Sequence, residues 1–174
     1  NRIFKIASVR LPWLLATVGG GLVSGMLLWQ FKVTFPAMLA LLTFVPVIAA
    51  MGGNIGSQSS TIVIRGFATG RIDFNNLLRY LARELALGAI MGVVCGIVLG
   101  VIAHFWHGEP LLAFAVGLSM TLAITFSAVT GVLIPFFFRF IKVDPAIAAG
   151  PLVTTANDVM CLAIYYSVAL LILL

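Results

Sequence analysis

Five long apolar runs, separated by short polar stretches, account for most of the sequence. They cover residues 11–31, 35–64, 85–106, 111–138 and about 146–174. A hydrocarbon core of about 30 Å is crossed by roughly 20 helical residues at about 1.5 Å each, so every run is long enough to span a membrane. Because the second, fourth and fifth runs exceed that length, we expect those helices to tilt, break or project beyond the bilayer.

The composition agrees with a chain that is surrounded by lipid. Hydrophobic residues make up 62% of it and charged residues only 9%, whereas a soluble domain has about 25% charged residues. In lipid the backbone must satisfy its hydrogen bonds internally, as helices and closed barrels do, and barrel strands would alternate apolar and polar positions. The unbroken runs therefore predict an all-α membrane protein with five transmembrane helices per chain. We expect it in the cell membrane, as a multi-pass protein of a bacterial inner membrane.

Basic residues fall almost entirely on one side of the five predicted helices. That side carries Arg2, Lys5, Arg10, Arg65, Arg71, Arg79, Arg83, Arg139 and Lys142, and the other side carries Lys32. Loops rich in Lys and Arg stay in the cytoplasm, which predicts a cytoplasmic N-terminus and an external C-terminus. No nucleic-acid partner is expected, because the basic residues are not interleaved with stacking aromatic residues.

Asp158 is the acidic residue whose place in the sequence needs an explanation. The other four lie on the Arg-rich side or in an outer loop: Asp73, Glu84, Glu109 and Asp144. A carboxylate at the centre of a spanning helix costs about 2.5–3.5 kcal/mol on insertion scales, so it normally faces a bundle interior or a water-filled path. Gly150, Thr154 and Asp158 recur at intervals of four residues and share one helix face. The structural alternative is an Asp held by hydrogen bonds between helices.

A glycine-rich stretch interrupts the second apolar run. Gly52, Gly53 and Gly56 each weaken a helix by roughly 1 kcal/mol relative to Ala, and Pro46 upstream lacks a backbone donor. We therefore expect the helix to open here and expose carbonyl oxygens, which is tolerated where they line a cavity. The alternative is close helix packing, since Gly52 and Gly56 form a small-xxx-small pair.

These two features are expected to meet near the middle of the membrane. Asn54 lies eleven residues from Arg65 (65 − 54) and Asp158 fourteen from Asp144 (158 − 144), or about 17 Å and 21 Å along a helix. Side-chain oxygens of Asn54 and Ser57 would join the carboxylate. Oxygen ligands without His or Cys indicate a hard cation, and magnesium suits one carboxylate because it keeps several waters. A single deep Asp per chain favours a two-fold dimer that supplies two.

Three further patterns predict structure rather than chemistry. Glycines at positions 88, 92, 96 and 100 form a stripe that is typical of a close-packed helix seam. Cys95 and Cys161 lie inside predicted helices, with no second thiol or His at metal-ligand spacing. His104 and His107 bracket aromatic residues at a helix end, which indicates an interfacial belt rather than a zinc site.

The residues quoted above also resemble a known family. Gly52-Gly53-Asn54-x-Gly56-x-Gln58, followed by Arg65, Asp144-Pro145 and Pro151-Leu152-Val153-Thr154-Thr155-x-Asn157-Asp158, is similar to the MgtE family of magnesium channels and transporters over essentially the whole chain. The resemblance implies a homodimer with a central pore lined by the second and fifth helices. It also implies a cytoplasmic N-terminal domain and paired CBS domains that sense magnesium. Because the sequence starts at Asn1 without Met, we expect that these regulatory domains are missing and that residues 1–174 are one transmembrane ion-conducting domain.

The resemblance also assigns ligands to the transported, partly hydrated Mg²⁺. Asp158 matches the pore carboxylate of the family, and Gly53 and Thr154 match positions that lend backbone carbonyls. Together with Asn54, Ser57 and Asn157, they are the candidate metal ligands. Ser57 stands where relatives often have Asn, and Gly150 stands where a relative can carry Asn, which leaves the choice among magnesium, manganese, cobalt and calcium open.

We therefore predict transport of magnesium, and of similar divalent cations, through a dimeric pore with a carboxylate site at mid-membrane. An ion-coupled secondary carrier that uses Asp158 as the coupling site is the alternative. A membrane scaffold would use Asp158 for bonds between helices. An intramembrane enzyme is not expected, because it would need a second deep carboxylate or a Ser–His pair within the membrane, and both His residues lie at a helix edge.

Overall fold

The described part of the chain, residues 2–34 and 39–173 of a computed structural model, is helical and contains no strand. Its elements are α1 (Arg2–Thr34), α2 (Leu39–Leu42), α3 (Val45–Ala68), the 3-10 turn η2 (Phe74–Asn76), α4 (Leu77–His107), α5 (Pro110–Phe140) and α6 (Pro145–Leu173). Five segments are long and apolar enough to cross a membrane: Leu11–Gln30, Leu39–Ala68, Phe74–His107, Pro110–Phe140 and Ala149–Leu173. The all-α fold with five spanning segments is confirmed.

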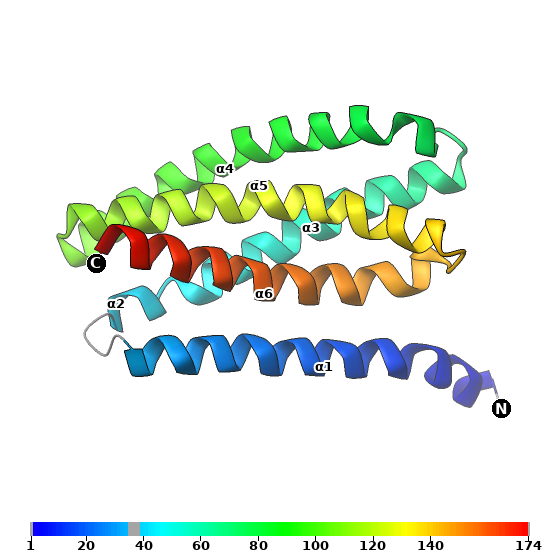
Figure 1. Cartoon of the computed structure of the whole chain (residues 1–174), viewed down its shortest axis with the longest axis horizontal. Helices are drawn as coiled ribbons and strands as arrows, with labels where there is room; N and C mark the ends of the chain where they lie inside the picture. The colour runs from blue at the N-terminus through cyan, green and yellow to red at the C-terminus, as the bar shows by residue number, and fades with distance from the viewer. Residues whose placement is uncertain (1, 35–38, 174) are drawn as a thin grey trace.

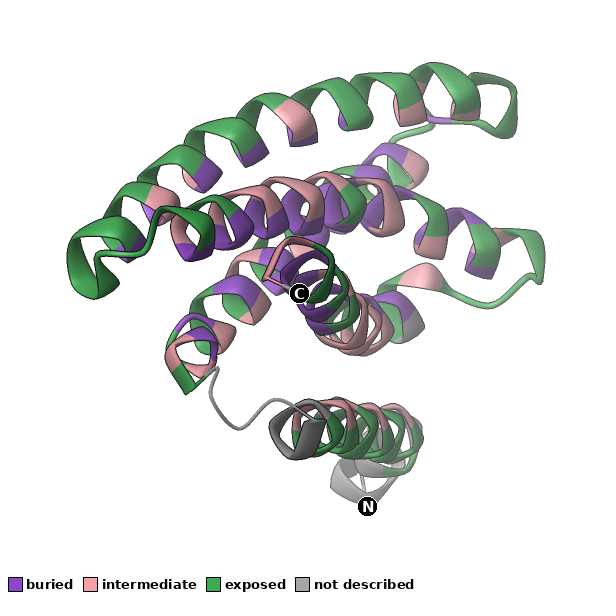
Figure 2. Ribbon diagram, turned by 60° about the vertical axis from the view of Figure 1, so that its left-hand side comes forward, coloured by how far each residue is buried: buried purple, intermediate pink, exposed green. Residues whose placement is uncertain are grey.

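In the view of Figure 1 the long helices run roughly along the bundle, and α3 crosses it obliquely from α2 to the start of α4. The turned view of Figure 2 shows that α4 and α5 also run at an angle to α1 and α6, which are seen almost end-on. The N-terminus, the α3–α4 connection and the α5–α6 connection lie at one end, and the α4–α5 connection and the C-terminus lie at the other. The three groups of basic residues are therefore gathered at one end of the bundle, as the sequence predicts. Which end faces the cytoplasm stays a prediction.

The α3–α4 connection is shorter than the sequence led us to expect. Helix α3 ends at Ala68 and α4 starts at Leu77, eight residues before the apolar run that predicted it. Gly70, with a φ of 68°, turns the chain at this point, and a left-handed backbone of this kind favours Gly. Backbone N–H groups of Thr69 and Arg71 donate to the carbonyls of Arg65 and Gly66, so the end of α3 is capped.

The expected opening of the second helix at its glycines is wrong. Helix α3 is continuous through residues 52–56, and the break lies upstream, at Thr43 and Phe44 between α2 and α3. Pro46 lies in the first turn of α3, where its missing N–H costs no helical hydrogen bond. The glycines remain helical because neighbouring helices press against them: a Cβ on Gly56 would collide with Asn157 of α6, and one on Gly131 of α5 would collide with the Gly56 carbonyl. Close packing offsets their low helix propensity.

Helix α5 lies at the centre of the bundle, where α3, α4 and α6 all pack on it. Its inward face is buried along most of its length, while α1 and the outer face of α4 are exposed (Figure 2). Helix α1 packs on α6, and its Trp13 also meets Phe138 of α5 edge to face, with ring centroids 5.7 Å apart. The exposed surface of these outer helices is largely apolar, as expected of a face that lies against lipid.

The predicted glycine seam is confirmed and joins α4 to α5. Cβ atoms on Gly92 and Gly100 would lie 2.6 Å and 3.0 Å from backbone carbonyl oxygens of Thr121 and Ala113. The Thr121 hydroxyl donates across the seam to the Gly92 carbonyl, at 3.1 Å. Backbones approach this closely because the stripe carries no side chains.

Candidate cation site

Asp158 lies at the middle of α6, thirteen residues from Pro145 and fifteen from Leu173. Gly53 occupies the middle of the segment from Leu39 to Ala68, and it faces the acid. A Cβ on Gly53 would lie 3.8 Å from Asp158 Oδ1 and 3.8 Å from the Thr154 methyl group. Because Gly53 has no side chain, the backbone of α3 comes against this face of α6. The structure therefore brings Gly53, Thr154 and Asp158 together; their depth in a membrane stays a prediction.

The face of α6 that carries Asp158 is open on one side. Gly150 and Thr154 are exposed and Asp158 is half-buried, which is consistent with the predicted four-residue stripe. The Thr154 hydroxyl donates to the Gly150 carbonyl at 3.2 Å. Among the side chains that the structure describes, no hydrogen-bond donor or basic group bonds to the Asp158 carboxylate. Both carboxylate oxygens are thus available to a ligand from outside the chain.

Two candidates on α3 extend this open side. Asn54 is exposed and Ser57 is half-buried, and with Thr61 they follow at i, i+3 and i+7 along one face of the helix. The Thr61 hydroxyl donates to the Ser57 carbonyl at 2.8 Å. This face lies beside Gly53, so its hydroxyl and amide groups continue from the Asp158 region along α3.

Asn157 is placed differently from the other five candidates. Its side chain is fully buried, accepts a hydrogen bond from the Thr130 hydroxyl of α5 and lies against Gly56. Its Nδ2 atom is buried and has no partner in the described part of the chain. Although it is next to Asp158 in sequence, the 100° turn per helical residue directs it into the α3–α5–α6 contact. In this position Asn157 joins α6 to α5.

Glu84 is a buried acid that sequence reasoning missed. We expected it only on the Arg-rich side, with no role inside the bundle. Its side chain is in fact only 8% exposed and accepts a 2.8 Å hydrogen bond from the Ser59 hydroxyl of α3 at Oε2. The sequence did contain a signal, because Glu84 precedes Gly88 by four residues and continues the glycine stripe. A residue on that stripe faces inward with the glycines.

Comparison with known proteins shows to which family the sequence is related. The sequence profile of MgtE, described as "Divalent cation transporter", matches residues 45–168. The chain belongs to the MgtE family. The matched segment covers α3 to most of α6 and includes all six candidate ligands.

Three members of this family have been named as magnesium transporters. The magnesium transporter MgtE of Bacillus subtilis (strain 168) is 37% identical over 97% of this chain, and that of Thermus thermophilus is 38% identical over 94%. The Enterococcus faecalis protein is 30% identical over 95%. The chain spans 38% of the first relative's length and 36% of each of the others. All three names describe transporters, and none describes an enzyme.

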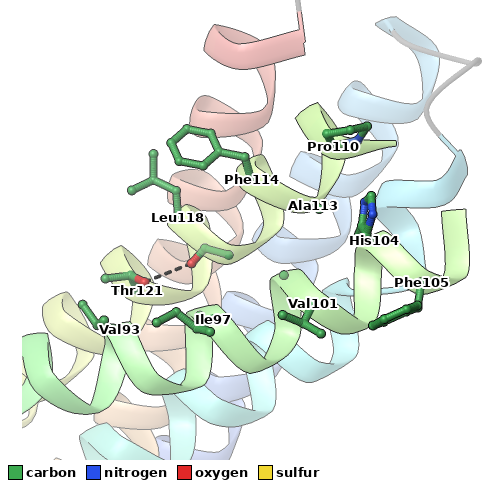
Figure 3. Close-up of a pocket in the computed structure, with 13 residues that line it drawn as sticks. Val93, Ile97, Val101, His104, Phe105, Pro110, Ala113, Phe114, Leu118 and Thr121 are labelled. Atoms are coloured by element: carbon green, nitrogen blue, oxygen red, sulfur yellow. Dashed lines mark hydrogen bonds between the residues drawn. The ribbon is translucent and has the colours of Figure 1, made fainter. Parts of the chain in front are cut away.

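In this MgtE-family chain, the described residues include no cluster of three or more His, Cys, Asp and Glu side chains able to hold a metal ion. The hollow drawn in Figure 3 is lined mainly by apolar side chains. It has a volume of about 810 Å³ and runs between α4 and α5 from Val93 to Phe105. Apart from His104 and Thr121 its labelled side chains are apolar, and it contains no carboxylate. Among the described residues, Asp158 is the acid that lies near the middle of a spanning segment without a hydrogen-bond partner.

Proposed function

We propose that this chain carries magnesium through the membrane along the open side of α3 and α6, with Asp158 as the carboxylate that attracts the ion. The proposal rests on the position of Asp158 and on its lack of a partner. It lies in the middle of an apolar helix, is half-exposed, faces Gly53 and has no hydrogen-bond or ion-pair partner in the described chain. An acid in such a place is costly unless it faces water or a cation. Membership of the MgtE family supports magnesium as that cation.

The neighbouring oxygens suit a cation that keeps part of its water shell. Magnesium dehydrates reluctantly and is bound by one or two carboxylates while retaining waters. Asp158 would provide the charge, backbone carbonyls of Gly53 and Thr154 would accept hydrogen bonds from the waters of the ion, and Asn54 and Ser57 would extend the polar path. Asn157 has a positioning role in this proposal, because it is buried against α5.

We further propose that the pore is completed by a second copy of the chain. A single carboxylate balances half the charge of a divalent ion, and a two-fold axis beside the open side of α6 would bring two Asp158 residues together. The Arg-rich end would face the cytoplasm, and cytoplasmic regulatory domains would act on the pore from there. The greater length of the three relatives supports such domains.

The test is magnesium entry into liposomes that contain the full-length protein and an internal magnesium dye. Replacing Asp158 with Asn keeps the shape and removes the charge, so we expect the flux to fall tenfold or more, on the order of 1.4 kcal/mol. Glu109→Gln is the matched control, since Glu109 is exposed at the start of α5 and its change should leave the flux unaltered. Equal flux in the folded Asp158→Asn protein and the wild type would reject Asp158 as the pore carboxylate.

A coupled carrier makes a different prediction in the same liposomes. A carboxylate without a charged neighbour can also take up a proton or a sodium ion. If Asp158 were such a coupling site, an imposed pH or sodium gradient would drive magnesium against its own gradient. In a channel, magnesium flux follows the magnesium gradient and the membrane potential alone.

A further inference from the structure

A second polar hollow lies at the Arg-rich end of the bundle, away from Asp158. It has a volume of about 420 Å³ and is formed by the last two turns of α3, the connection that follows, and the first turn of α4. Arg65, Thr69, Arg71 and Tyr80 line it together with apolar side chains, among them Ile62. At about 30 Å³ per water molecule, this space equals roughly fourteen waters, which is enough for a phosphate and the glycerol attached to it.

Neither arginine in this hollow is neutralised by the rest of the described chain. The acids at this end are already engaged: Asp73 accepts from the Phe74 N–H, Asp144 from the Ala146 N–H and Glu84 from the Ser59 hydroxyl. The guanidinium groups of Arg65 and Arg71 have no ion pair or hydrogen bond there. By contrast, Arg139 at the same end lies 4.3 Å over the ring of Phe67. The hollow thus has two positive charges without counter-charges.

The backbone around the hollow does not oppose an anion. A helix C-terminus is normally electronegative because its last carbonyls are free. Here the Arg65 and Gly66 carbonyls accept from the Thr69 and Arg71 N–H groups and also from the Thr69 hydroxyl. The groups left to meet a ligand are the guanidinium donors and the Tyr80 hydroxyl, and planar guanidinium groups bind phosphate in bidentate fashion.

We propose that this hollow binds the headgroup phosphate of an anionic phospholipid. The apolar wall selects a lipid over a free phosphate, because Ile62 is 56% exposed and lies one helical turn from Arg65 toward the centre of the spanning segment. An acyl chain whose phosphate meets Arg65 and Arg71 would run along Ile62. Basic pockets between helices at a membrane surface are suited to anionic headgroups. This proposal does not depend on the magnesium pathway or on Asp158.

The test compares two lipids with identical acyl chains, phosphatidylglycerol and phosphatidylcholine, bound to the full-length protein in detergent and counted by native mass spectrometry. We expect the wild type to retain phosphatidylglycerol more tightly than phosphatidylcholine. The Arg65→Gln/Arg71→Gln variant should bind phosphatidylglycerol roughly thirtyfold more weakly. The matched control is Arg79→Gln/Arg83→Gln, which removes the same charge from exposed positions of α4 at the same end and should bind as the wild type does.

Three results would overturn the proposal. Equal loss of binding in the two double variants would indicate diffuse attraction to a basic surface. Equal retention of the two lipids by the wild type would show that headgroup charge is not recognised. Displacement of phosphatidylglycerol by millimolar inorganic phosphate would indicate a site for a free anion. Circular dichroism will show whether the Arg65→Gln/Arg71→Gln protein folds. If it does not, the single variant Arg71→Gln replaces it, because Arg71 lies in the connection outside the helices. This variant should weaken phosphatidylglycerol binding roughly fivefold, and unchanged binding would reject the site.

Discussion

Replacing Gly92 with Ala tests whether the glycine stripe of α4 sets the distance between α4 and α5. A Cβ on Gly92 would lie 2.6 Å from the Thr121 carbonyl oxygen, and an ordinary contact begins at 3.4 Å. The two helices must therefore separate by about 0.8 Å at this point (3.4 − 2.6). The hydrogen bond from Thr121 Oγ1 to the Gly92 carbonyl, now 3.1 Å long, would lengthen to about 3.9 Å and be lost.

The expected cost follows from three contributions. Overpacking a well-packed contact costs typically about 1–3 kcal/mol, and a hydrogen bond between membrane helices contributes about 0.6 kcal/mol. Ala is also a better helix former than Gly, which offsets about 1 kcal/mol of this cost. We therefore expect Gly92→Ala to lower the free energy of unfolding by about 0.6–2.6 kcal/mol.

Gly21→Ala is the matched control for this substitution. A Cβ on Gly21 of α1 would have no atom of the described chain within 4 Å, so helix propensity alone should raise the free energy of unfolding, by up to about 1 kcal/mol. Titration of mixed micelles with sodium dodecyl sulfate, followed by far-UV circular dichroism, measures both changes. If Gly92→Ala were as stable as the wild type or more so, backbone contact at Gly92 would not fix the spacing of α4 and α5.

Two further substitutions test polar contacts inside the bundle, with the same unfolding assay. Tyr165→Phe removes the buried 2.7 Å hydrogen bond from the Tyr165 hydroxyl to the Leu41 carbonyl. We expect it to lower the free energy of unfolding by about 1 kcal/mol. An unchanged free energy of unfolding would show that this bond does not stabilise the break before α3. Glu84→Leu leaves the Ser59 hydroxyl buried without its acceptor and should cost about 1–3 kcal/mol, whereas Glu84→Gln keeps an acceptor oxygen there and should cost less. Equal losses in the two Glu84 variants would contradict the role of that hydrogen bond.

The sequence predicted the number of spanning helices because hydrophobic length is a property of each segment by itself. It also predicted that Asp158 and the glycine-rich stretch lie at one depth, since helix rise converts residue counts into distances. The glycine stripe of α4 was recognisable for a similar reason, because a four-residue repeat defines a face. These are all features that depend on one helix at a time.

Features that depend on which helices touch were predicted less well. Helix propensity suggested an open backbone at Gly52–Gly53, but contacts with α5 and α6 keep α3 helical there. Asn157 and Asp158 are neighbours in sequence, and only the packing of α6 shows that one side chain faces α5 while the other faces the open side. Glu84 was explained by its basic neighbours on the Arg-rich side alone, although its spacing to Gly88 placed it on the buried stripe.

The connection between α4 and α5 has a consequence for how the protein is made. Only Gly108 and Glu109 separate these two helices of 31 residues each, so their contacts are local in the chain and form with little loss of loop entropy. Gly53 and Asp158, in contrast, are 105 residues apart in sequence (158 − 53). Because chains are synthesised from the N-terminus, the α4–α5 hairpin can assemble while α6 is still in the ribosome. We therefore expect the contact between Gly53 and Asp158, which forms the proposed cation site, to be the last of these to form, and to be absent from any nascent chain that stops before α6.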